Sequence, residues 1–283
     1  MDGYKITRIL SPALYGDVVL GCEITSGDEV AIKRVNLKHA TRRQRIGSHD
    51  VLAEDAFSEV TINKGLPYHD HVVQFRHSFR DGDVLHAVFD FCPGGDLFNR
   101  IMDLQSPLPE NILRRYFYQI TSGVQFLNKN GYCHGDLSLE NVFLTKNDDC
   151  CLGDLGLAWP LHGLRSIPVG KPFYMPPEAL TKECRYAPKE ADLWSLGIVL
   201  FIMMFRCPPF QLASCEEPRY QYFQQRGLVG LLKGWKLYNL YSESALHLLS
   251  QLLMEDPSDR MPIEAILDHP WLRSCNDEEL CNL

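Results

Sequence analysis

The most constraining feature of the sequence is a change of pattern at Cys92-Pro93-Gly94-Gly95. Before this break, short runs of β-branched and aromatic residues are separated by turn residues, a pattern that predicts strands. After it, apolar residues recur at helical spacing over longer stretches. The chain has 283 residues, of which 45% are hydrophobic, so it can bury a sizeable core. The sequence therefore predicts an α+β fold in which a small strand-rich part precedes a larger, mainly helical part.

The expected elements can be placed by residue. One main helix, from about Val51 to Gly65, interrupts the strands because its apolar residues recur at helical spacing and Gly65 supplies a stop. The run Gly227 to Leu232 fits either a partner groove or a packed helix or turn. The expected strands are 18–20, 30–32, 72–75 and 84–91, and the expected helices of the second part are 97–102, 109–130, 191–205, 243–254 and 262–267.

Composition and charge exclude several classes of protein. The sequence contains no run of about 18 apolar residues, so no membrane span is expected. The N-terminal residues lack the apolar core of a signal peptide, and we expect a soluble chain in the cytosol or nucleus. The formal net charge of −8 argues against a general nucleic-acid binder. The only locally basic run, Arg42-Arg43-Gln44-Arg45, is explained more simply as a solvated loop.

The cysteines give no sign of a disulfide framework or a zinc site. Ten are present, Cys150 and Cys151 are adjacent, and no two have the C-x-x-C spacing. We therefore expect reduced thiols.

Four motifs then occur in a fixed order. Val30-Ala31-Ile32-Lys33 ends an expected strand with a lysine, which alone is a weak signal. His134-Gly135-Asp136-Leu137-Ser138-Leu139-Glu140-Asn141 follows about a hundred residues later and matches H-R-D-x-x-x-x-N except at Gly135. Asp154-Leu155-Gly156 starts thirteen residues after Asn141, and Pro176-Pro177-Glu178 comes next. Together they are far more specific than any one of them.

In order and spacing these motifs resemble those of the protein kinase family. Asp192 to Gly197 and Arg260 extend the resemblance, which covers about Tyr4 to Leu272. It implies a bilobal protein-kinase fold over residues 4–272, with a small lobe at about 1–90, a hinge at about 90–95 and a large lobe at about 96–283. It also implies transfer of the γ-phosphate of ATP, with Mg²⁺, to Ser or Thr of protein substrates.

The resemblance assigns catalytic roles that suit phosphoryl transfer, which needs positioning and charge neutralisation. Asp136 is expected to orient the substrate hydroxyl and accept its proton. Asn141 and Asp154 are expected to hold the Mg²⁺ ions. Lys33 is expected to contact the phosphates and to be held by Glu59 of the main helix. A solvated helix charge is the simpler alternative for Glu59.

The resemblance also implies a nucleotide site and one structural ion pair. Val18 and Ala31 are expected to cover the adenine ring from above and Phe143 from below. Phe89 is expected to be the gatekeeper residue. The backbone of 90–92 is expected to form hydrogen bonds with the base. Glu178 and Arg260 are expected to form a buried ion pair outside the site. The expected nucleotide-binding residues are Leu10, Ser11, Gly16, Val18, Ala31, Lys33, Phe89, Asp90, Cys92 and Phe143.

The sequence departs from the family pattern at several points. In the glycine-rich loop, Ser11 to Val18, only Gly16 remains of three glycines, and this stiffer cover is expected to weaken ATP binding. Gly135 replaces the catalytic-loop arginine, and Ser166 is the only hydroxyl besides Tyr174 between Leu157 and Met175. Phosphorylation of this segment is therefore not expected to be the switch. Asn63, one turn after Glu59, stands where a hydrophobic residue is usual.

Two further departures form a pair. Ser138 stands where Ser/Thr kinases carry a lysine, and Lys171 stands where they carry a threonine. We hypothesise that the amine has changed sides, so that Lys171 reaches the transferring phosphate. The alternative is two unrelated losses in a decaying enzyme.

The substrate class and the rival functions also rest on the resemblance. Gly170 to Met175 resembles the docking loop of Ser/Thr kinases, and Asp96 and Glu140 match positions that hold an Arg upstream of the acceptor in basophilic kinases. The rival function is a pseudokinase that acts as a nucleotide-binding scaffold or allosteric regulator, and a small-molecule kinase is a third option. Retention of Lys33 together with the full catalytic set favours the enzyme.

Overall fold

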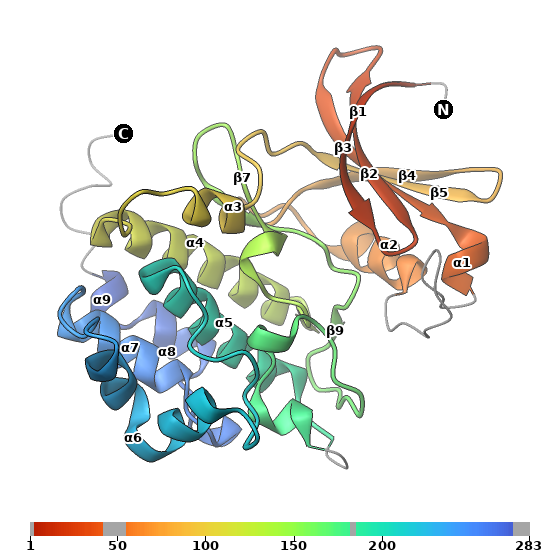
Figure 1. Cartoon of the computed structure of the whole chain (residues 1–283). Helices are drawn as coiled ribbons and strands as arrows, with labels where there is room; N and C mark the ends of the chain where they lie inside the picture. The colour runs from red at the N-terminus through yellow and green to blue at the C-terminus, as the bar shows by residue number, and fades with distance from the viewer. Residues whose placement is uncertain (1–2, 42–54, 182–184, 274–283) are drawn as a thin grey trace. The chain divides into compact units, whose positions relative to one another are not determined.

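The computed structural model describes residues 3–41, 55–181 and 185–273 (Figure 1). The chain divides into two compact units. The first comprises Met1–Gly95 and Phe143–Leu157, and the second comprises Asp96–Val142 and Ala158–Leu283. The first is rich in strands and the second is mainly helical, which confirms the predicted fold class.

A five-stranded antiparallel sheet forms the centre of the first unit. Its order is β1-β2-β3-β5-β4. The prediction for 72–75 was wrong: Val72 makes only an isolated bridge to Leu152, and the strand starts at Phe75. The strands are β1 (Tyr4–Ala13), β2 (Gly16–Glu23), β3 (Glu29–Asn36), β4 (Phe75–Asp81) and β5 (Val84–Asp90).

The sheet register sorts side chains onto two faces. Lys33 pairs with Val18 on one side and Ala87 on the other, so these side chains share a face. By the period of two, Ala31 and Phe89 lie on that face as well. This face also buries an apolar cluster against the main helix, made of Tyr15, Val35, Leu37, Ala56, Val60, Phe75, Leu85 and Ala87. The opposite face carries the smaller cluster of Tyr4, Val19, Val30, Ile32 and Val88.

Two helices follow β3. The short α1 (Leu37–Thr41) was not predicted, and the main helix is α2 (Ala56–Gly65). Asp55 caps α2 because its carboxylate accepts the N–H groups of Phe57 at 3.0 Å and Ser58 at 3.2 Å. The expected earlier start at 51–54, and the basic run 42–45, lie outside the described residues.

The β7–β8 hairpin brings a distant part of the sequence to the first unit. It comprises β7 (Val142–Leu144) and β8 (Cys150–Leu152). Gly94 donates its N–H to the Leu144 carbonyl at 3.0 Å, and Leu144 donates to the Gly95 carbonyl at 2.8 Å. A Cβ on Gly94 would lie 2.6 Å from the Leu144 Cβ, so this close approach requires glycine. The expected hinge is thereby fixed beside β7.

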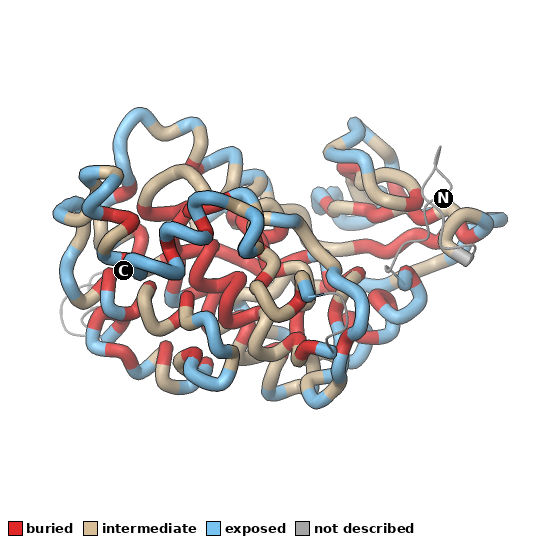
Figure 2. The backbone as a smooth tube through the Cα atoms, turned by 60° about the horizontal axis from the view of Figure 1, so that its bottom comes forward, coloured by how far each residue is buried: buried red, intermediate tan, exposed pale blue. Residues whose placement is uncertain are grey.

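In the second unit, α5 (Pro188–Phe205) is buried over most of its length and packs against α4 (Glu110–Lys129) and α7 (Glu243–Leu252). Figure 2 colours the chain by burial. A short sheet pairs β6 (Tyr132–Cys133) with β9 (Trp159–Pro160). No helix of the described residues is both long and apolar enough to cross a bilayer. The other helices are α3 (Leu97–Met102), α6 (Pro218–Gly234), α8 (Ile263–Leu267) and α9 (Pro270–Arg273), with 3₁₀ turns at Leu139–Asn141, Pro172–Tyr174, Pro177–Leu180 and Pro257–Asp259.

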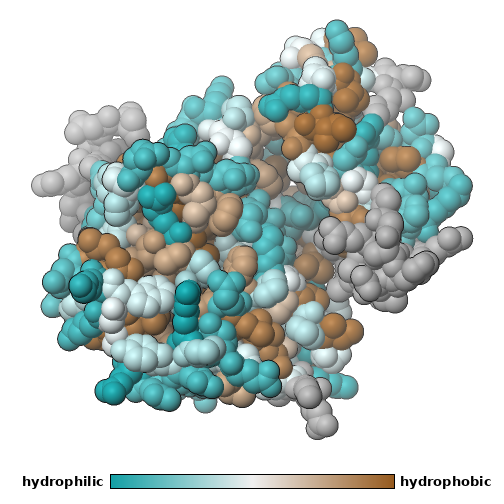
Figure 3. Space-filling model, in the orientation of Figure 1, coloured by the Kyte–Doolittle hydropathy of each residue, from teal (hydrophilic) through white to brown (hydrophobic). Residues whose placement is uncertain are grey.

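The surface mixes polar and apolar residues. Hydrophobic residues (brown in Figure 3) are interspersed with hydrophilic ones on the face drawn. Exposed apolar side chains in the first unit include Ile9 and Ile24. Single exposed hydrophobic residues are common in folded proteins, so they indicate no docking site.

Candidate active site

The site in the first unit centres on the Lys33 ammonium. Its Nζ donates to Glu59 Oε1 at 3.0 Å and Oε2 at 2.8 Å, and to Asp154 Oδ1 at 2.8 Å. Lys33 is 8% exposed and Glu59 3% exposed. A buried charge is tolerated when it is paired and hydrogen-bonded, which both carboxylates provide here. Of the two interpretations of Glu59, the geometry matches the ion pair and not a solvated helix charge.

Local structure fixes both carboxylates. Burial raises the pKa of Glu59, while the Lys33 ammonium lowers it and the Asp154 carboxylate raises it. Asp154 has φ 57°, a left-handed conformation that Asp tolerates better than most residues and that often marks functional sites. Asn63 is buried, and its amide donates to the Glu59 carbonyl at 2.9 Å. The polar residue at this apolar position is therefore satisfied within α2.

The ten expected nucleotide-binding residues all lie in the first unit. Val18, Ala31 and Phe89 share the sheet face of Lys33. Phe143 in β7 lies against Gly153, where an added Cβ would come within 2.8 Å of its ring. A largely apolar surface with one buried lysine suits a base and its phosphates.

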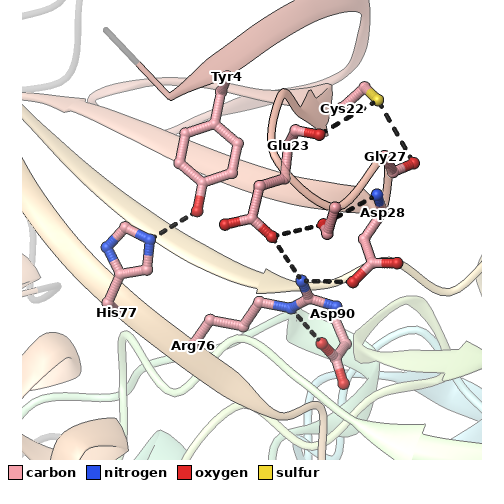
Figure 4. Close-up of polar contacts among 9 residues, drawn as sticks. Tyr4, Cys22, Glu23, Gly27, Asp28, Arg76, His77 and Asp90 are labelled. Atoms are coloured by element: carbon pink, nitrogen blue, oxygen red, sulfur yellow. Dashed lines mark hydrogen bonds and ion pairs between the residues drawn. The ribbon is translucent and has the colours of Figure 1, made fainter.

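A charge network anchors the start of the hinge (Figure 4). Arg76 Nε donates to Asp90 Oδ1 at 2.6 Å, and its Nη1 lies 3.4 Å from Asp28 and 3.7 Å from Glu23. The hydrogen bond with Asp90 is the largest cause that raises the pKa of Arg76. One carboxylate oxygen of Asp90 is thereby bonded to Arg76. Arg76 was not predicted from the sequence.

The β1–β2 hairpin replaces the flexible loop that three glycines would form. Pairing continues to Ala13 opposite Gly16, so the turn is only Leu14-Tyr15. Tyr15 is 2% exposed and packs in the cluster beside α2, and its carbonyl accepts the Asn36 N–H at 2.8 Å. A Cβ on Gly16 would lie 1.9 Å from the Arg34 carbonyl oxygen. The hairpin tip is therefore anchored by its aromatic residue, and Gly16 is required by the sheet.

The catalytic loop lies in the second unit. The Asn141 amide donates to the Asp136 carbonyl at 2.7 Å and to Asp136 Oδ2 at 2.9 Å. Asp192 is buried, and its carboxylate accepts the N–H groups of His134 at 2.6 Å and Gly135 at 3.0 Å. The loop backbone is thus held from α5, and the Asp136 carboxylate is oriented by Asn141.

Lys171 lies beside this loop. Its Nζ donates to the Ser138 hydroxyl at 2.6 Å and lies 3.6 Å from Glu140 Oε1. Ser138 is fully buried. The preceding residue, Gly170, has φ 90°, and an added Cβ would lie 2.9 Å from Asp136 Oδ1. The chain at Gly170 is therefore pressed against the Asp136 carboxylate, which brings the Lys171 amine to the same loop.

The two units therefore hold different parts of the expected set. The first brings together Lys33, Glu59 and Asp154, and the second brings together Asp136, Asn141 and Lys171. The two expected Mg²⁺ ligands, Asn141 and Asp154, belong to different units. Within the described residues, no group of three His, Cys, Asp or Glu side chains is arranged to hold a metal by itself. An amide and a carboxylate leave several Mg²⁺ positions to phosphate oxygens and water, as is usual for that ion.

The second unit also contains the expected ion pair between Arg260 and Glu178 and a further buried arginine, Arg165. Arg260 donates to both carboxylate oxygens of Glu178, at 2.6 and 2.7 Å, and to the Glu190 carbonyl at 2.8 Å. Arg165, in the segment before Lys171, is also buried. Arg165 was not predicted from the sequence, although the loss of arginine at Gly135 was a signal that another cation takes its place.

Comparison with known proteins agrees with this geometry. The model of the protein kinase domain matches residues 4–272. The chain therefore belongs to the protein kinase domain family.

Several curated relatives match nearly the whole chain. It is 32% identical over 275 residues to CBL-interacting serine/threonine-protein kinase 5 of Arabidopsis thaliana, covering 95% of this chain and 58% of that protein. It is 30% identical to serine/threonine-protein kinase chk1 of Schizosaccharomyces pombe, covering 96% and 53%. It is also 30% identical to serine/threonine-protein kinase ULK3 of Homo sapiens, covering 96% and 55%. The chain thus spans little more than half the length of these relatives.

Proposed function

We propose that the chain transfers the γ-phosphate of ATP to Ser or Thr residues of protein substrates. The observation that carries this proposal is the buried Lys33 ammonium, shared between Glu59 and Asp154 at 2.8 to 3.0 Å. A scaffold needs no buried lysine held between two carboxylates, whereas phosphoryl transfer needs a fixed cation at the phosphates. Similarity to serine/threonine-protein kinases over almost the whole chain supports the same proposal.

The residues divide the work of the reaction. Lys33 binds phosphate oxygens, and the Asp136 carboxylate, oriented by Asn141, accepts the proton of the substrate hydroxyl. Asn141 and Asp154 are the residues that would hold Mg²⁺, which would neutralise charge on the phosphates. Ala31 and Val18 cover one face of the base and Phe143 the other.

The test compares the wild-type chain with Asp136→Asn and Asp103→Asn in ATP-dependent phosphate incorporation into a generic basic protein. Asp103 is an exposed carboxylate of the same unit and serves as the matched control. We expect Asp136→Asn to lower the rate about 10²- to 10⁴-fold and Asp103→Asn to leave it unchanged. If the wild type gives no more incorporation than Asp136→Asn at high ATP, the enzyme proposal fails. The pseudokinase then becomes the better account.

We further propose that Lys171 supplies the cation that the catalytic loop lacks at Ser138. Its amine reaches that serine at 2.6 Å, and the neighbouring Gly170 abuts Asp136. A cation placed where charge develops in the transition state is worth about 10²- to 10³-fold in rate. Lys171→Ala is expected to lose that factor at saturating ATP, and Lys129→Ala, an exposed lysine on α4, is the control.

The reciprocal variant makes this test sharper. Ser138→Lys combined with Lys171→Ser returns the amine to the catalytic loop. We expect it to recover most of the rate that Lys171→Ala loses. An intact rate in Lys171→Ala would contradict the exchange and leave two unrelated losses as the explanation.

We propose that the preferred substrates carry an Arg upstream of the acceptor. Asp96 caps α3 by accepting the Asn99 N–H at 2.8 Å, and Glu140 accepts the Tyr174 hydroxyl at 3.0 Å and faces Lys171. Since Lys171 already balances part of the Glu140 charge, the preference is expected to be modest. A peptide array should show enrichment of Arg two or three residues before the acceptor, and Lys171→Ala should strengthen it. No enrichment in either array would remove this proposal.

We also propose that the chain acts in the cytosol or nucleus. The cysteines that the structure describes are unbridged thiols, which suits a reducing compartment. Cell fractionation checks this, and recovery from a secretory compartment would contradict it.

A further inference from the structure

Two cationic side chains of the activation segment, the stretch from Leu157 to Met175, lie beside a catalytic loop that has no cation of its own. The loop from His134 to Asn141 contains Asp136 and Glu140 but no Lys or Arg. A third carboxylate, that of Asp192, is buried against its backbone. Burial raises the pKa of Asp192, since an uncompensated charge there is costly.

Arg165 brings a cation to this region from the activation segment. Its side chain lines the same cavity as Gly135, Asp136 and Asp192. Arg165 is 7% exposed, whereas the next three residues, Ser166, Ile167 and Pro168, are exposed. Arg165 is therefore turned inward at a point where the chain otherwise faces solvent.

Backbone and side-chain contacts both hold Arg165 in place. Its N–H and carbonyl each bond to Tyr186 at 2.9 Å. Its guanidinium lies over the Trp159 ring, 4.6 Å from the centroid. The Tyr186 hydroxyl donates to the Ile167 carbonyl at 3.2 Å. These contacts tie 159–167 to the strand-like stretch that precedes α5.

Electrostatics agrees with the geometry. Burial lowers the pKa of Arg165, and Tyr186 and the Asp192 carboxylate act in the opposite direction. A guanidinium is buried at such a cost only where stacking, hydrogen bonds and an opposite charge compensate. Gly135 has φ 76° and no side chain, so the cavity is left open for the arginine that arrives from the other segment.

We propose that Arg165 is a positioning residue that keeps the activation segment docked on the catalytic loop without a phosphate. Trp159 and Tyr186 hold its guanidinium, and Asp192 connects it electrostatically to the loop backbone. The segment then needs no phosphorylation of Ser166 to present Gly170 and Lys171. This inference depends on the proposed function only for its activity readout, because docking can be measured in an inactive chain.

The test is hydrogen exchange of the full chain after phosphatase treatment, with mass spectrometry confirming that no phosphate remains. We expect Arg165→Ala to speed exchange of the amides in 159–171 about tenfold and to lower the phosphorylation rate. Arg219→Ala is the matched control, because Arg219 is exposed and lies over Trp235 at 5.8 Å in a different part of the unit. It should change neither readout.

A second variant covers the case in which Arg165→Ala does not fold. Tyr186→Phe keeps the ring but removes the hydroxyl that bonds to Ile167, and it should speed exchange in the same segment by a smaller factor. Unchanged exchange in the foldable variants, or dephosphorylated wild type that already exchanges as fast as Arg165→Ala, overturns the proposal. Faster exchange in Arg165→Ala than in the wild type, together with a wild-type chain that transfers no phosphate, would leave this inference standing and reject only the proposed function.

Discussion

The strand-rich unit and the helical unit compensate for lost motif residues in different ways. In the first, Ser11 and Ala13 stand where the family pattern has glycines. There β1 pairs as far as the turn, and the buried Tyr15 holds the turn in place. In the second, two cationic side chains of another segment, Arg165 and Lys171, lie beside the catalytic loop, which itself contains no Lys or Arg. Packing is enough to hold a hairpin that has lost its glycines. A loop that has lost its cations needs positively charged side chains from elsewhere.

The largest expected effect concerns the ion pair of the helical unit. Arg260→Ala should lower its free energy of unfolding by about 3–5 kcal/mol, because the Glu178 side chain, only 15% exposed, would lose its Arg260 partner. The Arg260 side chain is fully buried. Urea unfolding measures the change, and Arg273→Ala, which breaks the exposed pair with Asp268, should cost less than about 1 kcal/mol. Equal effects of the two variants would contradict the role of burial.

The next effect tests the anchored hairpin. Tyr15→Ala should destabilise the strand-rich unit by about 3 kcal/mol, as expected for loss of a buried ring, and should raise the KM for ATP. Tyr15→Phe keeps the ring and should retain most of the stability. Tyr118→Ala, at an exposed position of α4, is the control and should stay within about 0.5 kcal/mol. If Tyr15→Ala behaves like Tyr118→Ala, packing does not hold the hairpin.

A third change acts on catalysis. Glu59→Gln removes the carboxylate that holds Lys33 and should lower kcat/KM about 10²-fold through loss of positioning. Peptide phosphorylation measures it, and Glu29→Gln, at an exposed position of β3, should leave the rate unchanged. A loss below about threefold would show that Asp154 alone positions the lysine.

The smallest effect is a pH dependence of stability to which His86 of the strand-rich unit contributes. Burial, and then the Arg34 cation, lower the pKa of His86, whose ring stacks on Phe79. The unfolded chain therefore binds the proton first, so stability is complete above about pH 6.5 and falls below it. The slope is at most about 1.4 kcal/mol per pH unit.

Urea midpoints between pH 7.5 and 5.5 check this dependence. His86→Phe should flatten the profile and His162→Gln, an exposed histidine of the other unit, should not. An unchanged slope in His86→Phe would assign the dependence to other groups.

The sequence predicted the elements with strong periodicity and the residues that form motifs. Helix 97–102 was predicted to the residue, and the two-part organisation followed from the break at Cys92. The helix α6 was left open because Gly227 and Gly230 obscure its period, and the structure has a kink there, with φ 64° at Gly227. The start of β4 was misplaced because Val72 and Val73 have high strand propensity but pair outside the sheet.

The site residues that could be predicted are those whose chemical type stands at a fixed position of a sequence motif. Lys33 and Glu59 form the expected ion pair, and Lys171 contacts Ser138, the other residue of the paired departure. Arg165 and Tyr15 could not be found in this way, because their roles depend on which cavity and which cluster each side chain enters. Tertiary packing decides that, and neither spacing nor residue type encodes it locally.

The packing around Gly16 bears on how relatives that have lost motif residues are classified as ATP-binding or not. Any side chain there would overlap the Arg34 carbonyl, at 1.9 Å from the first added atom, whether or not a nucleotide ever binds. A glycine at this position therefore indicates the close approach of the neighbouring strands β2 and β3. A relative that has abandoned ATP would still retain it, and counting it as a remnant of nucleotide binding would misclassify that relative. Ser11 and Ala13, on an edge strand with no such constraint, are the positions whose identity carries the information.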